Sequence, residues 1–114
     1  MLSKLEDHRR FPRVKVQAAL HYQVRGKPDF SNSIADNISL GGLRFSDHSF
    51  IAPETILMLE VNVLSRVLNP IARIAWSHPI SHADKFQFGV EFIEFEHSQK
   101  KYLQDFVAMQ MQQV

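Results

Sequence analysis

Apolar and polar residues alternate along most of the chain, and this period of two is typical of strands that bury one face. The longest such stretch begins at Val14, and every second residue from there to Val24 is apolar. Shorter stretches that alternate, or are rich in β-branched and aliphatic residues, follow at 34–38, 43–46, 56–64, 71–76 and 86–92. The pattern therefore predicts six strands.

The period changes to that of a helix from about Ser98, which is a candidate N-cap. The residues expected on one broad face of this helix are Tyr102, Leu103, Phe106, Val107 and then Met109 or Gln110. Short strands joined by turns favour a closed barrel, because closure leaves no exposed edge and a helix can cover one end.

We therefore expect a single domain over 1–114 that is dominated by β-structure: a six-stranded antiparallel β-barrel with a C-terminal α-helix. Its parts would be an N-terminal arm over 1–12, the barrel over 13–96 and the helix over 97–114.

Composition narrows the possible functions. Thirteen Lys and Arg residues face twelve Asp and Glu, so the net charge of +1 gives no global field for binding nucleic-acid polymers. The absence of cysteine excludes disulfides, thiolate metal sites and cysteine nucleophiles, and it fits a reducing compartment. The N-terminus is charged, and no stretch approaches the roughly 20 apolar residues of a membrane span. We expect a cytoplasmic protein without membrane insertion.

Two short motifs carry candidate chemistry. Arg9 and Arg13 have the spacing R-x-x-x-R, with Arg10 between them. The arginine side chain is a planar fork that can grip phosphate oxygens, pair with the O6 and N7 edge of guanine and stack on a purine face.

The second motif, Asn37-Ile38-Ser39-Leu40-Gly41-Gly42, has the form [D/N]-x-S-x-x-G. Asn37 and Ser39 are two residues apart and would share one face of a strand, where an amide and a hydroxyl offer specific hydrogen bonds. Gly41 or Gly42 can adopt positive φ and leaves room for a ligand.

Together, in this order and about two dozen residues apart, the motifs resemble those of the PilZ domain family. The first strand, Ile74-Ala75-Trp76, Phe88-Gly89-Val90-Glu91-Phe92 and the closing helix also look like features of that family. The resemblance implies a split-barrel type of β-barrel that binds the bacterial second messenger cyclic di-GMP at its mouth.

The resemblance also implies roles for individual residues. The arginines would contact phosphates and guanine, the second motif would form a wall facing guanine, and Trp76 would add stacking or apolar contact. The residues expected to bind cyclic di-GMP are Arg9, Arg10, Arg13, Asp36, Asn37, Ser39, Gly41, Gly42 and Trp76. We expect no other cofactor, an effector protein as partner, and a monomer or homodimer.

Other interpretations compete with this one. The arginines can be a solvated basic tail, the second motif an ordinary turn, and Trp76 a packing residue. Ser39 lacks a G-x-S-x-G elbow, and the spacing of His78 and His82 around Pro79 does not suit a helical metal site, so we expect neither catalysis nor a metal. An adaptor of the same fold without a nucleotide ligand, and a barrel that binds single-stranded nucleic acid, remain alternatives.

Overall fold

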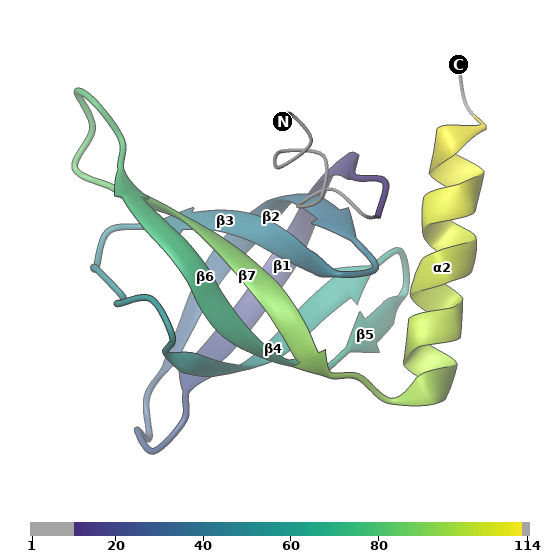
Figure 1. Ribbon diagram of the computed structural model, residues 1–114, viewed down its shortest axis with the longest axis horizontal. Coiled ribbons are helices and arrows are strands. Elements are labelled where there is room, and N and C mark those ends of the chain that lie inside the picture. The colour runs from purple at the N-terminus through teal and green to yellow at the C-terminus, as the bar shows by residue number, and fades with distance from the viewer. Residues whose placement is uncertain (1–10, 113–114) are drawn as a thin grey trace, which may run out of the picture.

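The computed structural model describes residues 11–112, which form seven strands and one helix (Figure 1). The elements are β1 (Val14–Val24), β2 (Phe30–Ser39), β3 (Gly42–Asp47), β4 (Ile56–Val63), β5 (Arg66–Leu68), β6 (Ile71–Pro79), β7 (Phe86–Glu94) and α2 (His97–Met111).

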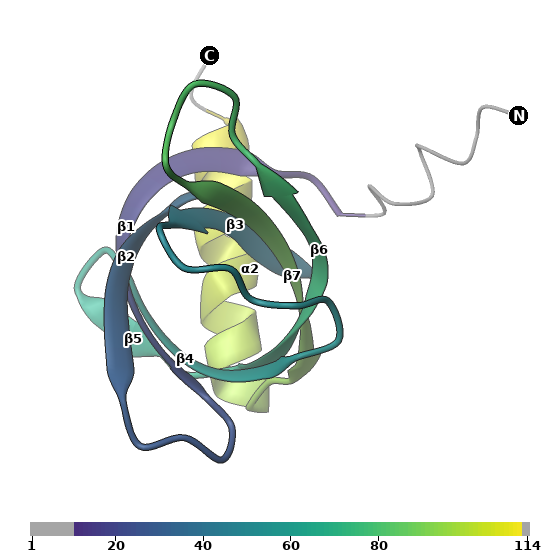
Figure 2. The same cartoon turned by 90° about the vertical axis from the view of Figure 1, so that its left-hand side faces the viewer.

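Six of these strands close into an antiparallel barrel, as the alternation predicts. The strand order is β1-β2-β3-β7-β6-β4-β5, and β1 also pairs with β4, so the sheet returns on itself. Figure 2 shows the strands as a ring with α2 behind it. The seventh strand, β5, forms a hairpin with β4 in which Val61 pairs with Leu68. Its three residues are too short to show a period in the sequence.

Alternation along the strands fills the barrel with apolar side chains. In β1, the buried residues are Ala18, Leu20 and Tyr22, as their spacing predicts. The rings of Phe45 and Phe88 are fully buried, and their centroids lie 5.1 Å apart. The interior is therefore a packed core rather than a ligand cavity.

Helix α2 covers one end of the barrel and buries Leu103, Phe106 and Val107. Its N-cap is Glu96 rather than Ser98: the Glu96 carboxylate accepts hydrogen bonds from the Gln99 backbone N–H at 3.1 Å and from the Ser98 hydroxyl. Within residues 11–112, no helix is long and apolar enough to cross a membrane.

Candidate functional site

A β-bulge in β2 determines how the second motif faces outward. Ala35 pairs with Phe45 and Asn37 pairs with Arg44, so Asp36 is an extra residue on the β2 side. Ala35 and Ile38 are fully buried, whereas Asp36 and Asn37 between them are both half-buried. The bulge thus turns two consecutive polar side chains toward the outside of the barrel wall.

Ser39 organises the turn that follows. Its side chain is buried, with 6% of the residue exposed, and its hydroxyl oxygen accepts a hydrogen bond from the Gly41 N–H at 3.1 Å. A longer contact of 3.5 Å joins the same hydroxyl to the Gly42 carbonyl oxygen. The hydroxyl is therefore committed to the turn from β2 to β3, where serine is a common turn residue.

The paired glycines allow close packing, and neither adopts the positive φ that a glycine can take. Among the described glycines, only Gly26 has positive φ, at 89°. A Cβ on Gly42 would collide with the backbone carbonyl oxygen of Val90, and one on Gly41 would lie 2.7 Å from Cδ2 of Phe11. The glycines thus let β7 and Phe11 approach the turn.

Cross-strand pairing aligns a row of residues on the outer wall. Asn37 of β2 pairs with Arg44 of β3, Arg44 pairs with Gly89 of β7, and Gly89 pairs with Trp76 of β6. Directly paired residues share a face of the sheet. The Trp76 indole covers Gly89, because a Cβ on Gly89 would lie 2.7 Å from its Cζ2 and closer still to its Nε1. The ring therefore lies close against the wall.

A cavity of about 500 Å³ opens over this part of the wall. It lies on the outside of the barrel rather than at its mouth, where the turn between β2 and β3 meets β6, β7 and the residues before β1. Its lining consists of Phe11, Arg13, Asn37, Ser39, Gly41, Gly42, Leu43, Ala75, Trp76, Gly89, Val90 and Glu91.

Six of the nine expected binding residues line this cavity: Arg13, Asn37, Ser39, Gly41, Gly42 and Trp76. Asp36 is not among the lining residues, since its carboxylate accepts a hydrogen bond from Arg44 Nε at 2.9 Å. Arg9 and Arg10 lie outside the described residues. The fold therefore joins one arginine of the first motif to the second motif and Trp76.

Sequence reasoning missed several lining residues, among them Phe11, Gly89 and Glu91. Phe11 stands between the arginines of the first motif, so the motif itself was a signal for its position. Gly89 interrupts an alternating strand, and an isolated glycine there indicates a close approach. Glu91 is exposed, as its place in the alternation predicts, and nothing local distinguishes it from a solvated strand residue.

The carboxylate of Glu91 forms an ion pair with a neighbouring arginine. Its Oε1 accepts a hydrogen bond from Arg73 Nη2 at 2.9 Å, and Arg73 Nε lies 3.8 Å from Oε1 of Glu54. The hydrogen bond and the charge of Glu91 raise the pKa of the Arg73 guanidinium above its ordinary value. The pair lessens the negative charge that Glu91 presents to an anion in the cavity.

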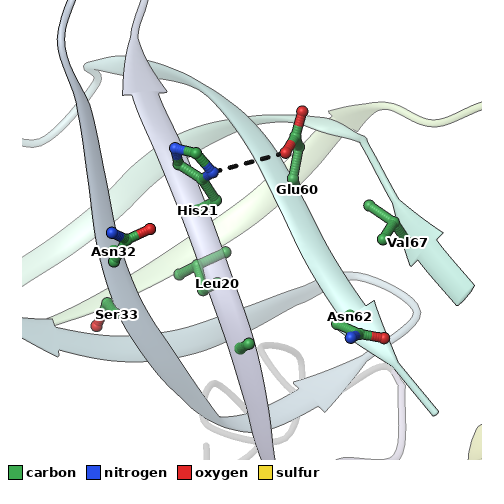
Figure 3. A pocket seen from close by; sticks show the side chains of 8 residues that line it. Leu20, His21, Asn32, Ser33, Glu60, Asn62 and Val67 are labelled. Atoms are coloured by element: carbon green, nitrogen blue, oxygen red, sulfur yellow. Dashed lines mark ion pairs between the residues drawn. The ribbon is translucent and has the colours of Figure 1, made fainter. Parts of the chain in front are cut away.

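A second hollow, of about 360 Å³, lies on another part of the outer wall, across β2, β1, β4 and β5 (Figure 3). His21 Nδ1 and Glu60 Oε1 are 3.7 Å apart there, and Asn32, Asn62 and Val67 are among the surrounding residues. It contains none of the expected binding residues. Among residues 11–112, no three side chains of a metal-ligating type gather at one place.

A closed barrel with a cavity built from an arginine, a glycine turn and a tryptophan defines a small binding domain. The family model of the PilZ domain matches residues 7–109, so this chain belongs to the PilZ domain family. The resemblance seen in the two motifs is thereby confirmed. No curated protein matches the chain.

Solved structures share this fold. The inhibitor of motility MotI/DgrA of Bacillus subtilis has a TM-score of 0.78 at 17% identity, over 92% of this chain and 52% of its own. The PilZ domain of Escherichia coli YcgR with c-di-GMP has a TM-score of 0.71 at 13% identity, over 91% of this chain and 92% of its own. Another structure of YcgR with c-di-GMP has a TM-score of 0.76 at 14% identity, over 91% of this chain and 46% of its own. This chain thus spans about half the length of the first and third of these chains.

Proposed function

We propose that this protein is a receptor for cyclic di-GMP that binds the dinucleotide in the cavity on the outer wall. The observation that carries the proposal is that Arg13, the turn motif and Trp76 line one cavity, although they come from separate parts of the chain. Its volume of about 500 Å³ falls in the range of roughly 300–1,000 Å³ that is usual for small-ligand sites. The complexes of YcgR with c-di-GMP, which have the same fold, support cyclic di-GMP as the ligand.

Each part of the cavity suits one part of the ligand. Arg13, together with Arg9 and Arg10, supplies guanidinium groups for the phosphates and the acceptor edge of guanine. Asn37 offers an amide that can donate to and accept from a guanine. Trp76 presents a ring for stacking, and Gly41 and Gly42 leave room that side chains would fill. Ser39 acts by holding the turn.

The function follows from binding, with no catalytic step. Binding of the dinucleotide joins residues of the arm to the wall of the barrel, and the surface formed in this way is recognised by an effector protein in the cytoplasm. A dianion held by guanidinium groups binds more weakly as salt concentration rises.

Isothermal titration with cyclic di-GMP tests the proposal. We expect the Arg9→Ala/Arg13→Ala double variant to lose about two orders of magnitude in affinity, because each charge-assisted contact contributes about 1.5 kcal/mol or more. Arg25→Ala is the control for the loss of an arginine far from the cavity. Arg25 is exposed and follows the far end of β1, roughly 40 Å of strand away from Arg13.

Titrations with GTP and with a single-stranded oligonucleotide complete the experiment. Binding of cyclic di-GMP alone, with loss in the double variant and none in the control, supports the receptor. An unchanged affinity in the double variant overturns the assignment of the site. No binding by the wild-type chain favours an adaptor without a nucleotide, and tighter binding of the oligonucleotide favours a nucleic-acid barrel.

A further inference from the structure

Arg44 is a cation on the outer wall that belongs to neither motif. It lies in the centre of β3, and its two cross-strand partners, Asn37 and Gly89, both line the cavity. Its side chain is 36% exposed. Because paired residues share a face of the sheet, the Arg44 side chain emerges on the face that bears the cavity.

The neighbours of Arg44 leave it room to reach a ligand. Gly89 has no side chain, and the space above it is covered by the Trp76 indole from the other side. The indole therefore lies over β7, the strand next to Arg44, and a ligand ring stacked on its outer face would lie one strand away from Arg44. Strands in a sheet are about 4.8 Å apart, which is within the reach of an arginine.

Asp36 holds the guanidinium in place. Arg44 Nε donates to Asp36 Oδ1 at 2.9 Å, and the Asp36 side chain is 42% exposed. A guanidinium has five N–H donors, so this bond leaves four others for further acceptors. The bulge at Asp36 and Asn37 is what makes the arrangement possible, because it directs the carboxylate to Arg44 and the neighbouring amide to the cavity.

We propose that Arg44 is a further ligand-binding residue, which contacts the anionic dinucleotide from the β3 side, and that Asp36 restrains it and lowers the affinity. This inference rests on the proposed function, since it requires that the cavity takes cyclic di-GMP. Ion pairs as exposed as that of Arg44 and Asp36 contribute little to stability, so a role in ligand binding accounts for the two residues better than a role in folding.

Two variants with opposite expected effects test the inference. Arg44→Gln removes the cation, and we expect it to weaken binding of cyclic di-GMP about tenfold, as loss of one charge-assisted hydrogen bond does. Asp36→Asn removes the restraint and a negative charge near a dianion, and we expect it to strengthen binding about threefold, by a Coulomb effect that salt reduces. Arg25→Gln is the matched control for the loss of one positive charge.

A purely structural role of the ion pair predicts a different result. If Arg44 and Asp36 only held the bulge in shape, either substitution would weaken binding, and the double variant would be no worse than the single ones. In our proposal, Asp36→Asn strengthens binding more in the wild-type background than in the Arg44→Gln background. Arg44→Lys keeps the charge but loses the planar fork, so its affinity should fall between those of wild type and Arg44→Gln.

The outcomes separate this inference from the proposed function. Wild-type binding with equal affinities for Arg44→Gln and Arg25→Gln overturns the role of Arg44 and leaves the receptor intact. Weaker binding by Asp36→Asn overturns the restraint. No binding by the wild-type chain overturns the receptor, and the inference with it. Circular dichroism and urea unfolding of each variant verify that the barrel is unchanged.

Discussion

Gly89 determines where the only tryptophan of the chain lies, and the substitution Gly89→Ala makes this dependence measurable. A Cβ at residue 89 would lie 2.7 Å from Trp76 Cζ2 and closer to Cε2 and Nε1, whereas ordinary contact begins at 3.4 Å. The indole must therefore move away from the wall by roughly 1 Å or more to regain normal contact. The added methyl group fills the space beneath the ring.

The energetic cost divides between folding and binding. Overpacking typically costs about 1–3 kcal/mol, and because Trp76 is half-buried at the surface its ring can yield, so we expect a loss near 1 kcal/mol in the free energy of unfolding. Stacking of a base on an aromatic ring contributes about 1–3 kcal/mol. If the displaced indole loses most of one stack, affinity for cyclic di-GMP falls about tenfold.

Trp76 itself supplies the assay, because its fluorescence has no other tryptophan to obscure it. We expect cyclic di-GMP to change this fluorescence in the wild type and to change it less in Gly89→Ala. In a Trp76→Ala background the added methyl group meets no ring, so Gly89→Ala should cost no further affinity. Equal losses from Gly89→Ala with and without the indole would refute the reasoning, since the effect would then come from the backbone of β7.

Three other predictions concern the frame of the site. Gly42→Ala should lower the free energy of unfolding, measured by urea unfolding, by about 3 kcal/mol, because its Cβ meets the β7 backbone, which cannot move aside as a side chain can. Gly26→Ala, where the Cβ meets open space but φ is positive, should lower it by about 1 kcal/mol. Tyr22→Phe removes the hydrogen bond to Asp47 Oδ2 at 2.6 Å and should lower the free energy of unfolding by about 1.5 kcal/mol at neutral pH. Burial and Asp47 raise the pKa of Tyr22 above its ordinary 10.0, so the wild type should lose stability relative to Tyr22→Phe as pH rises above 10. A difference in stability that stays constant with pH would contradict this. Hydrogen bonds from Ser98 and Gln99 lower the pKa of the Glu96 carboxyl below its ordinary 4.5. The carboxylate therefore contributes to stability above pH 4.5, and this contribution is lost as pH falls through the lowered pKa. The melting temperatures of wild type and Glu96→Gln should converge in acid.

The alternation of side chains predicted the barrel well because it is a local property. From Val14 to Val24 the spacing identified the side chains that face the core, of which the central three are buried and the outer three partly buried, and Phe88 and Val90 of β7 are likewise buried. The closing helix was also predicted, although its N-cap was not, because Glu96 and Ser98 are both near the helix start and only the backbone geometry decides between them. The hairpin strand β5 has no pattern of its own and depends on pairing with β4.

The candidate site divides in a similar way. The motifs pointed to Arg13, Asn37, Ser39, Gly41, Gly42 and Trp76, which line the cavity. The sequence did not show the local role of each motif residue: Ser39 lines the cavity and also holds the turn through its hydroxyl, and Gly41 and Gly42 allow close packing without positive φ. Asp36 was expected in the cavity, but the bulge directs its carboxylate to Arg44.

By itself, the sequence determined six of the seven strands, the inward face of those that alternate clearly, and two motifs specific enough to indicate the family. Periodicity and motif spacing need only neighbours along the chain. Only the tertiary structure decided that the cavity lies on the outer wall, that Gly89 sets the place of Trp76, and that Arg44 stands beside Asn37. These relations follow from the register of β2, β3, β7 and β6, which closure of the barrel fixes across long distances in the sequence. No local sequence pattern determines that register. Many of the residues of the site could therefore be predicted from the sequence, but their arrangement could not.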